Sequence, residues 1–209
     1  MTDHRASPDE AREFLARNPD IRHVQMMLVD HNGVLRGKSL RPHELEALYE
    51  RGRPLPSSIA ALTLDGDDAE HTGLLWEVGD MDCIAFPVPG TLLRSPWLSA
   101  PTAQVLVMLD PELGMPSAAA DPRLAAMRVI ERLRKDDLNP VMAVELEFYL
   151  LDGASVSRRP PVPVAPRGAH PHVYSIDEVE ALRRFFDALY RACDAQRLPA
   201  ETATTEFGP

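Results

Sequence analysis

Apolar and polar residues alternate through residues 141–150, which read Val-Met-Ala-Val-Glu-Leu-Glu-Phe-Tyr-Leu. This alternation predicts a strand. Because successive strand side chains point to opposite faces, Glu145 and Glu147 share one face with Tyr149, while the apolar residues between them share the other. The pattern therefore predicts a strand that rests on a core and carries two carboxylates about 6–7 Å apart along its length.

Two carboxylates at this spacing repel each other unless a positive charge lies between them. A hard divalent cation such as Mg²⁺ would satisfy both, because it prefers oxygen ligands. The alternative is a half-exposed strand with two solvated glutamates, since amphipathic strands with glutamate on the wet face are common. The stretch alone leaves both interpretations open.

The first hundred residues predict short strands around one or two helices. Ser7-Pro8-Asp9-Glu10 has the sequence of a capping box and should begin a helix that ends at Asn18-Pro19. Asn32-Gly33 predicts a hairpin between two strands. A second helix is expected from Pro42 to Gly52. The predicted strands cover residues 21–29, 34–40, 59–64 and 83–86.

The second half alternates strands and helices. The apolar run of residues 102–109 is typical of a central strand, and Asp121-Pro122 should begin a helix. Residues 152–173 form a long connection rich in proline, glycine, serine and arginine. Ser175 should begin an amphipathic helix that packs across the sheet. Threonine-rich residues 200–206 predict a last strand.

Composition narrows the classes of function. The chain has 209 residues, of which 44% are hydrophobic and 26% are charged, as in globular proteins. Its net charge of −10 argues against a nucleic-acid surface. No apolar run has the ~20 residues of a membrane span, and two cysteines without a motif favour a reduced, cytoplasmic protein. The aspartates of residues 65–82 lack the spacing of a calcium loop, so ordinary turns are expected there.

Three stretches, in this order, resemble the glutamine synthetase family. They are Val29-Asp30-His31-Asn32-Gly33-Val34-Leu35-Arg36-Gly37-Lys38, then Glu145-Leu146-Glu147-Phe148-Tyr149-Leu150, and then Thr205-Glu206-Phe207-Gly208-Pro209. The resemblance covers residues 21–209 and implies an α+β fold. It implies an N-terminal helical segment (residues 1–20), a small β-grasp domain (21–100) and the start of a catalytic α/β domain with an antiparallel sheet (101–209).

The resemblance also implies a reaction and a site. Family members activate the γ-carboxylate of glutamate with ATP, and an amine then displaces phosphate from the γ-glutamyl phosphate. Two anions must approach each other, so divalent metals, Mg²⁺ or Mn²⁺, are needed. By the family pattern Glu147 and Glu206 would bind the metal nearer glutamate and Glu145 the metal nearer ATP. Ser57 and Ser58 would lie near the amine site of a neighbouring subunit, in a ring-shaped homo-oligomer, possibly a dodecamer.

Within the family, Arg53-Pro54-Leu55-Pro56-Ser57-Ser58 and Phe86-Pro87-Val88-Pro89-Gly90-Thr91-Leu92 look like the γ-glutamyl-polyamine synthetase branch. Ammonia-using members carry an aspartate where Leu55 stands here. Without that carboxylate the site lacks the negative charge that would bind ammonium. This indicates that a larger amine is the acceptor. Three alternatives stay open: a glutamate–ammonia ligase proper, a non-catalytic assembly or binding module, and a generic acidic domain whose metal site is accidental.

The family's Gly-Gln-x-Glu motif, its later histidine and glutamate ligands and its arginines are not found in these 209 residues. The sequence therefore predicts the N-terminal portion of a ligase. We expect this portion to be inactive alone and to bind Mg²⁺ weakly, because a partial carboxylate cage lacks ligands and rigidity.

Overall fold

The computed structural model describes residues 5–113, 116–153, 162–164 and 173–206. The chain divides into two compact units, Met1–Pro140 and Val141–Pro209, and each is described by itself. The strand of residues 102–109 belongs to the sheet of the first unit, and the expected domain boundary at residue 100 stays a prediction.

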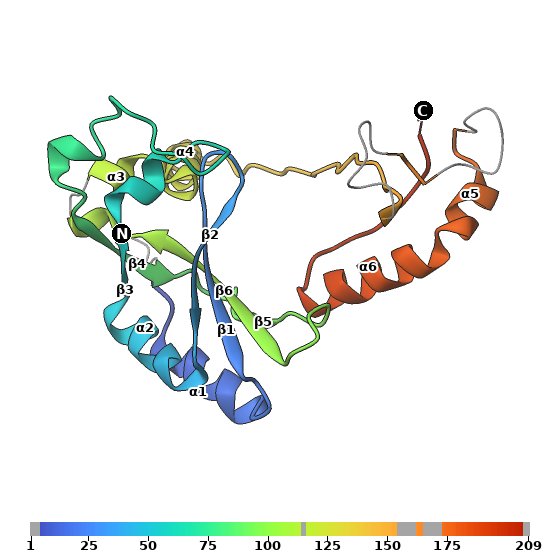
Figure 1. The fold of residues 1–209 in the computed structure, drawn as a ribbon, viewed down its shortest axis with the longest axis horizontal. Coiled ribbons are helices and arrows are strands. Elements are labelled where there is room, and N and C mark those ends of the chain that lie inside the picture. Colours follow the sequence, from blue (N-terminus) through green and yellow to red (C-terminus); the bar gives the residue numbers. More distant parts are fainter. Residues whose placement is uncertain (1–4, 114–115, 154–161, 165–172, 207–209) are drawn as a thin grey trace. The chain divides into compact units, whose positions relative to one another are not determined.

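The first unit is built on one mixed sheet (Figure 1). Its strands run in the order β2-β1-β6-β4-β3, and β5 also pairs with β6. β1 and β6 are parallel, whereas the other pairs are antiparallel. The strands are β1 (His23–Val29), β2 (Leu35–Leu40), β3 (Arg53–Pro56), β4 (Asp82–Pro87), β5 (Leu93–Arg94) and β6 (Thr102–Leu109). The first unit therefore mixes helices with a sheet, in agreement with the expected α+β class, while the narrower β-grasp assignment stays a prediction.

Helices complete the first unit. They are α1 (Pro8–Arg17), α2 (Leu45–Arg51), α3 (Pro116–Ala119) and α4 (Pro122–Lys135), with 3₁₀ turns η1 (Pro42–Glu44), η2 (Ser57–Ala61), η3 (Trp76–Val78) and η4 (Pro111–Leu113). The core joins apolar residues of the central strands and of α1 and α2, among them Phe14, Val24, Met26, Leu48 and Val105. This core holds the hairpin and the β3–η2 connection in place.

The hydrophobic pattern predicted most elements of this unit correctly. The helix expected from Pro8 to Asn18-Pro19, the hairpin of residues 21–29 and 34–40 and the strand of residues 102–109 are confirmed, with bounds that differ by at most two residues. The strand expected over residues 59–64 is wrong, because the 3₁₀ turn η2 extends to Ala61 and only Leu62 then makes an isolated bridge, to Asp68. The capping box is only half made: Ser7 Oγ accepts from the N–H of Asp9, whereas the carboxylate of Glu10 accepts from the N–H of Gly90.

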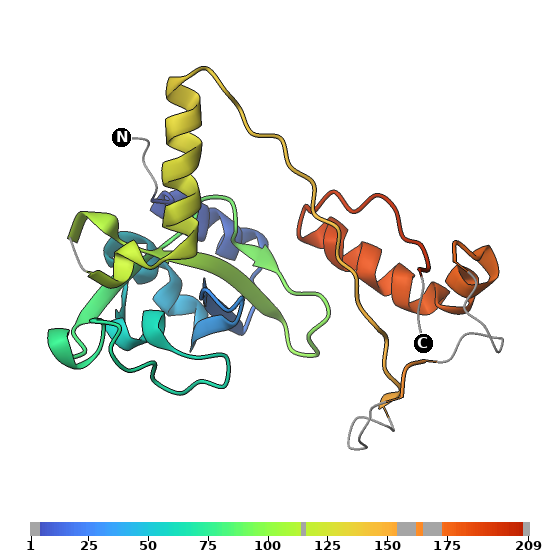
Figure 2. The same ribbon diagram turned by 90° about the horizontal axis from the view of Figure 1, so that it is seen from above.

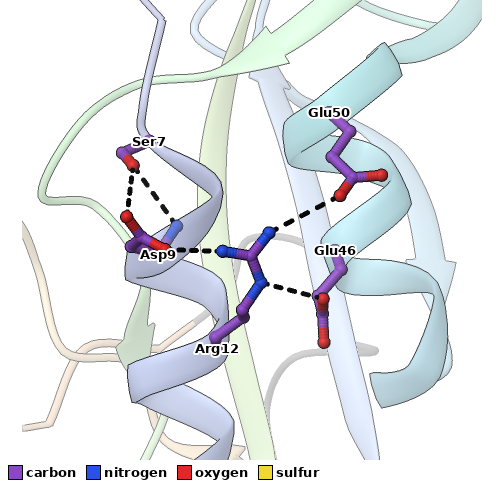
Figure 3. A network of polar contacts seen from close by, with 5 residues as sticks. All are labelled: Ser7, Asp9, Arg12, Glu46 and Glu50. Atoms are coloured by element: carbon purple, nitrogen blue, oxygen red, sulfur yellow. Dashed lines mark hydrogen bonds and ion pairs between the residues drawn. The ribbon is translucent and has the colours of Figure 1, made fainter.

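A network of charges joins α1 to α2. The guanidinium of Arg12 contacts Asp9 on its own helix, and it reaches Glu46 (3.2 Å) and Glu50 (3.6 Å) on α2 (Figure 3). The hydrogen bond to Glu46, ahead of the charges of Asp9 and Glu46, raises the pKa of Arg12. All these side chains are exposed, so the network orients the two helices and adds little stability.

The second unit contains two helices, α5 (Ile176–Ala181) and α6 (Arg183–Ala195) (Figure 2). Leu182 separates them, as the C-cap of α5 and the N-cap of α6. The expected strand of residues 141–150 is not formed, and neither is that of residues 200–206. Among the described residues, the second unit has one isolated β-bridge, between Leu151 and Pro163. A strand needs a neighbouring strand for its N–H and C=O groups, and the described part of this unit supplies none.

Apolar side chains of the second unit consequently remain open to solvent. Val141 is 95% exposed and Val144 81% exposed. Phe148 makes an edge contact with Phe185 of α6, and the ring series continues through Phe186 to Tyr190. None of the described residues between 141 and 206 is fully buried. The apolar face of α6 is therefore present as predicted, but the described part of the second unit contains no sheet on which it could pack.

Among the residues that the structure describes, the helices are all too short or too polar to cross a bilayer.

Candidate functional site

Ser57 and Ser58 begin the 3₁₀ turn η2, directly after β3. Ser57 is buried, and its hydroxyl donates to the carbonyl oxygen of Leu74 at 2.9 Å. Its backbone N–H donates to the carbonyl oxygen of Met81 at 3.0 Å. The Ser57 side chain is therefore committed to contacts inside the chain.

Asp80 holds the next peptide group. Its Oδ1 accepts from the backbone N–H of Ser58 at 2.9 Å and lies 3.4 Å from Ser57 Oγ. A hydroxyl has one proton, and the shorter contact of Ser57 Oγ goes to Leu74. No residue in the described part of the chain binds the hydroxyl of half-exposed Ser58. Of the two predicted substrate-binding serines, Ser58 is the one whose hydroxyl can meet a ligand.

The tip of the β1–β2 hairpin braces the chain that follows η2. Asn32 Nδ2 donates to the carbonyl oxygen of Leu62 at 3.0 Å, and Arg36 Nη2 donates to that of Thr63 at 3.1 Å. These contacts connect the Asp30–Lys38 stretch, which carries part of the family resemblance, to the segment leading away from Ser57 and Ser58. The hairpin thus acts as a support for this loop.

Asp30 fixes the hairpin itself. Its Oδ1 accepts from the N–H groups of Asn32 and Val34, both at 2.8 Å, and its Oδ2 lies 3.0 Å from Arg36 Nε. Burial acts to raise the pKa of this carboxyl, but the bonds from Val34, Arg36 and Asn32 outweigh burial, so the pKa is lowered. Asp30 is therefore a charged group that the fold stabilises.

Leu55 lies in the core. It is 1% exposed and pairs with Cys83 across β3 and β4. The family resemblance equates this position with an aspartate that holds ammonium. In this chain the side chain packs inside the first unit, so it contacts no amine from the open surface.

The three predicted metal ligands lie in the second unit. Glu145 and Glu147 are exposed on the extended segment, and Glu206 is exposed near the C-terminal end, whose following residues 207–209 lie outside the described part. The backbone N–H of Tyr174 donates to the carbonyl oxygen of Thr205 at 2.8 Å, which anchors the chain beside Glu206.

The described residues contain no group of three or more histidine, cysteine, aspartate or glutamate side chains arranged to hold a metal ion. The carboxylates are the right donors for Mg²⁺ or Mn²⁺, but the strands that would align them are not formed here. The metal site formed by Glu145, Glu147 and Glu206 therefore stays a prediction.

Sequence reasoning missed Asp80 as a functional neighbour of the serines. The sequence predicts only ordinary turns for the aspartates of residues 65–82, and Asp80 lies more than twenty residues along the chain from Ser57 and Ser58. A pattern of neighbouring residues cannot predict a contact between residues so far apart in the sequence. Only the turn signal itself indicated that this segment has a defined backbone.

Comparison with known proteins relates the chain to the glutamine synthetase family. Residues 119–209 match the model described as glutamine synthetase, catalytic domain. Over 211 residues the chain is 34% identical to "Gamma-glutamylputrescine synthetase PuuA" of Escherichia coli (strain K12), covering 98% of this chain and 44% of that protein. It is 26% identical over 187 residues to a glutamine synthetase of Mycobacterium tuberculosis (strain H37Rv), covering 87% of this chain and 39% of that protein.

Among solved structures, one described as a novel glutamine synthase homolog matches with a TM-score of 0.65 and 20% identity. The match covers 90% of this chain and 41% of the other, and it supports the fold alone. The chain thus spans less than half the length of each of these three relatives.

Proposed function

We propose that this chain, which belongs to the glutamine synthetase family, forms the N-terminal part of an ATP-dependent ligase that joins the γ-carboxylate of glutamate to an amine. The observation that carries the proposal is the 34% identity to a γ-glutamylputrescine synthetase, which extends over 98% of this chain. The match includes both the serine loop of the first unit and the glutamates of the second.

The proposed acceptor is a polyamine or a related amine. The relative named for γ-glutamylputrescine is more similar in sequence than the mycobacterial glutamine synthetases, at 34% against 26% identity. The side chain of Leu55 is buried in the first unit, so the lack of a carboxylate at this position does not by itself select the amine. A polyamine has several amine groups joined by methylene segments. Its recognition therefore does not require a single carboxylate of the kind that binds ammonium.

In this proposal Glu145, Glu147 and Glu206 supply oxygen ligands to divalent metals, Mg²⁺ or Mn²⁺, which neutralise the phosphates of ATP and the carboxylate of glutamate. Ser58 lies at the amine site of a neighbouring subunit, so the ligase works as a homo-oligomer, as a ring of the dodecamer type. The proposed location is the cytoplasm. A β-grasp domain forms the first unit, and the catalytic domain begins in the second.

A second candidate is a glutamate–ammonia ligase whose ammonium site is built from other residues. The 26% identity to a mycobacterial glutamine synthetase supports this candidate. A third is an assembly module without chemistry. Phosphate release by the complete protein separates the three. The proposal predicts release that requires glutamate, ATP and a polyamine. Equal rates with ammonium would favour the second candidate, and no release with any amine would favour the third.

A further inference from the structure

We propose that Asp80 is a positioning residue of this ligase: it fixes the Ser57–Ser58 peptide so that the Ser58 hydroxyl faces the amine. This inference rests on the proposed function, since it assigns the amine to Ser58. It adds a residue to which the sequence patterns gave no role.

The contacts that fix the serine pair all come from one turn. Ser57 donates its N–H to Met81 and its hydroxyl to Leu74, and Ser58 donates its N–H to Asp80. The first residues of a helical turn have N–H groups without partners inside the turn. The segment from Leu74 to Met81 supplies these partners, so it sets the orientation of both side chains.

The backbone of this turn holds the Asp80 carboxylate in place. Asp80 has a φ of +47° and follows Gly79, whose φ is +64°. The N–H of Asp80 donates to the carbonyl oxygen of Leu75 at 3.0 Å. Two successive residues in the left-handed region reverse the chain within a few atoms, and this reversal brings the carboxylate to the start of η2.

The two serines therefore have different roles. Ser57 is buried and anchors the loop through its hydroxyl, while the Ser58 hydroxyl has no partner among the described residues and the Ser58 N–H is held by Asp80. Loss of the Asp80 acceptor would let the Ser58 peptide rotate, and the hydroxyl would no longer be held toward the amine. The KM for the amine should therefore rise while the KM values for ATP and glutamate stay the same.

The φ of +47° decides which variants are informative. Alanine would add backbone strain, whereas glycine and asparagine both tolerate this region. Asp80→Gly removes the acceptor without strain. Asp80→Asn keeps an acceptor oxygen and removes the charge. His71→Gly is the matched control, since His71 also has a positive φ (+64°) in the same region and its side chain is exposed.

The test measures amine KM and kcat in the complete protein, together with hydrogen exchange of the Ser58 amide. Asp80→Gly should raise the amine KM about tenfold, which corresponds to about 1.4 kcal/mol, and should speed exchange at Ser58. Asp80→Asn and His71→Gly should stay within about twofold of the unsubstituted protein.

Two results would overturn the positioning role: an unchanged amine KM in Asp80→Gly, or an equal loss in Asp80→Asn, which would make the charge the decisive property. If the unsubstituted protein ligates no amine, the proposed function fails. Amide exchange at Ser58 then decides separately whether Asp80 holds the loop.

Discussion

Arg36 Nε lies 3.0 Å from Oδ2 of Asp30, and the same guanidinium donates to the carbonyl oxygen of Thr63. The Asp30 side chain is 2% exposed and that of Arg36 is 20% exposed. One buried ion pair thus links the hairpin tip to the loop that leads from the candidate amine site.

Asp30→Ala should lower the free energy of unfolding by about 2–3 kcal/mol, because it leaves two N–H groups and a mostly buried guanidinium without their acceptor. Urea unfolding measures the loss. Asp67→Ala serves as the control, since Asp67 is exposed and its carboxylate makes none of the contacts described here. Equal stability of the two variants would contradict the role of Asp30.

The lowered pKa of Asp30 makes its contribution depend on pH. A carboxyl whose pKa is lower in the folded state stabilises the fold above its unfolded pKa of about 3.9, and this stabilisation is lost as the pH falls through the folded value. The difference in stability between the unsubstituted protein and Asp30→Asn should therefore be constant from pH 5 to 7 and shrink below about pH 4. A difference that grows toward acid would refute the assignment.

Gly37 should tolerate no side chain. A Cβ there would overlap the carbonyl oxygen of Met26, and its φ of +153° is one that side chains rarely adopt. Gly37→Ala should therefore disrupt the β1–β2 pairing and cost more than ~3 kcal/mol of stability. Gly33→Ala is the matched variant, since its φ is +76° and nothing lies near its Cβ. It should cost about 1 kcal/mol, as thermal unfolding can measure.

Leu55→Asp should unfold the first unit instead of creating an ammonium site. The side chain is 1% exposed, and an unpaired carboxylate at this position loses its hydration without gaining a partner. We expect a loss of more than about 3 kcal/mol, whereas Leu55→Met should cost less than about 1.5 kcal/mol. A stable Leu55→Asp protein that gains activity with ammonium would instead place residue 55 at the amine.

Removing the predicted metal ligands should change the metal requirement of the complete protein. Glu145→Gln, Glu147→Gln and Glu206→Gln should each raise the Mg²⁺ or Mn²⁺ concentration for half-maximal activity by at least about tenfold, since each removes a charged oxygen ligand. Glu201→Gln, also exposed in the second unit, is the control. An unchanged metal requirement in all three variants would remove these glutamates from the site.

Local signals explain how much the sequence could predict. Ser7 and Asp121 cap helices through bonds to residues two or three positions away, and Asn32-Gly33 closes a hairpin between adjacent strands. These elements follow from neighbouring residues, so the patterns predicted them. Glu10 was expected to close the cap at Ser7, but it binds Gly90, eighty residues away.

The predictions that failed depend on distant partners. Residues 141–150 have the alternation of a strand, yet alternation specifies a face and supplies no neighbour for the backbone. The first N–H groups of η2 donate to Asp80 and Met81, which are distant in the sequence. The apolar residues of this segment therefore suggest a strand when the sequence is considered alone. For the same reason the pairing of Ser58 with Asp80 emerged only from the structure, while the residue types of the metal site could be proposed from sequence.

The most direct test of the ligase proposal is product formation in competition. The complete protein is given glutamate, ATP, Mg²⁺ and equal concentrations of putrescine and ammonium, and the products are measured by mass spectrometry. The account predicts that γ-glutamylputrescine is formed in excess over glutamine. Glutamine as the main product, or no glutamate–amine product at all, would contradict it.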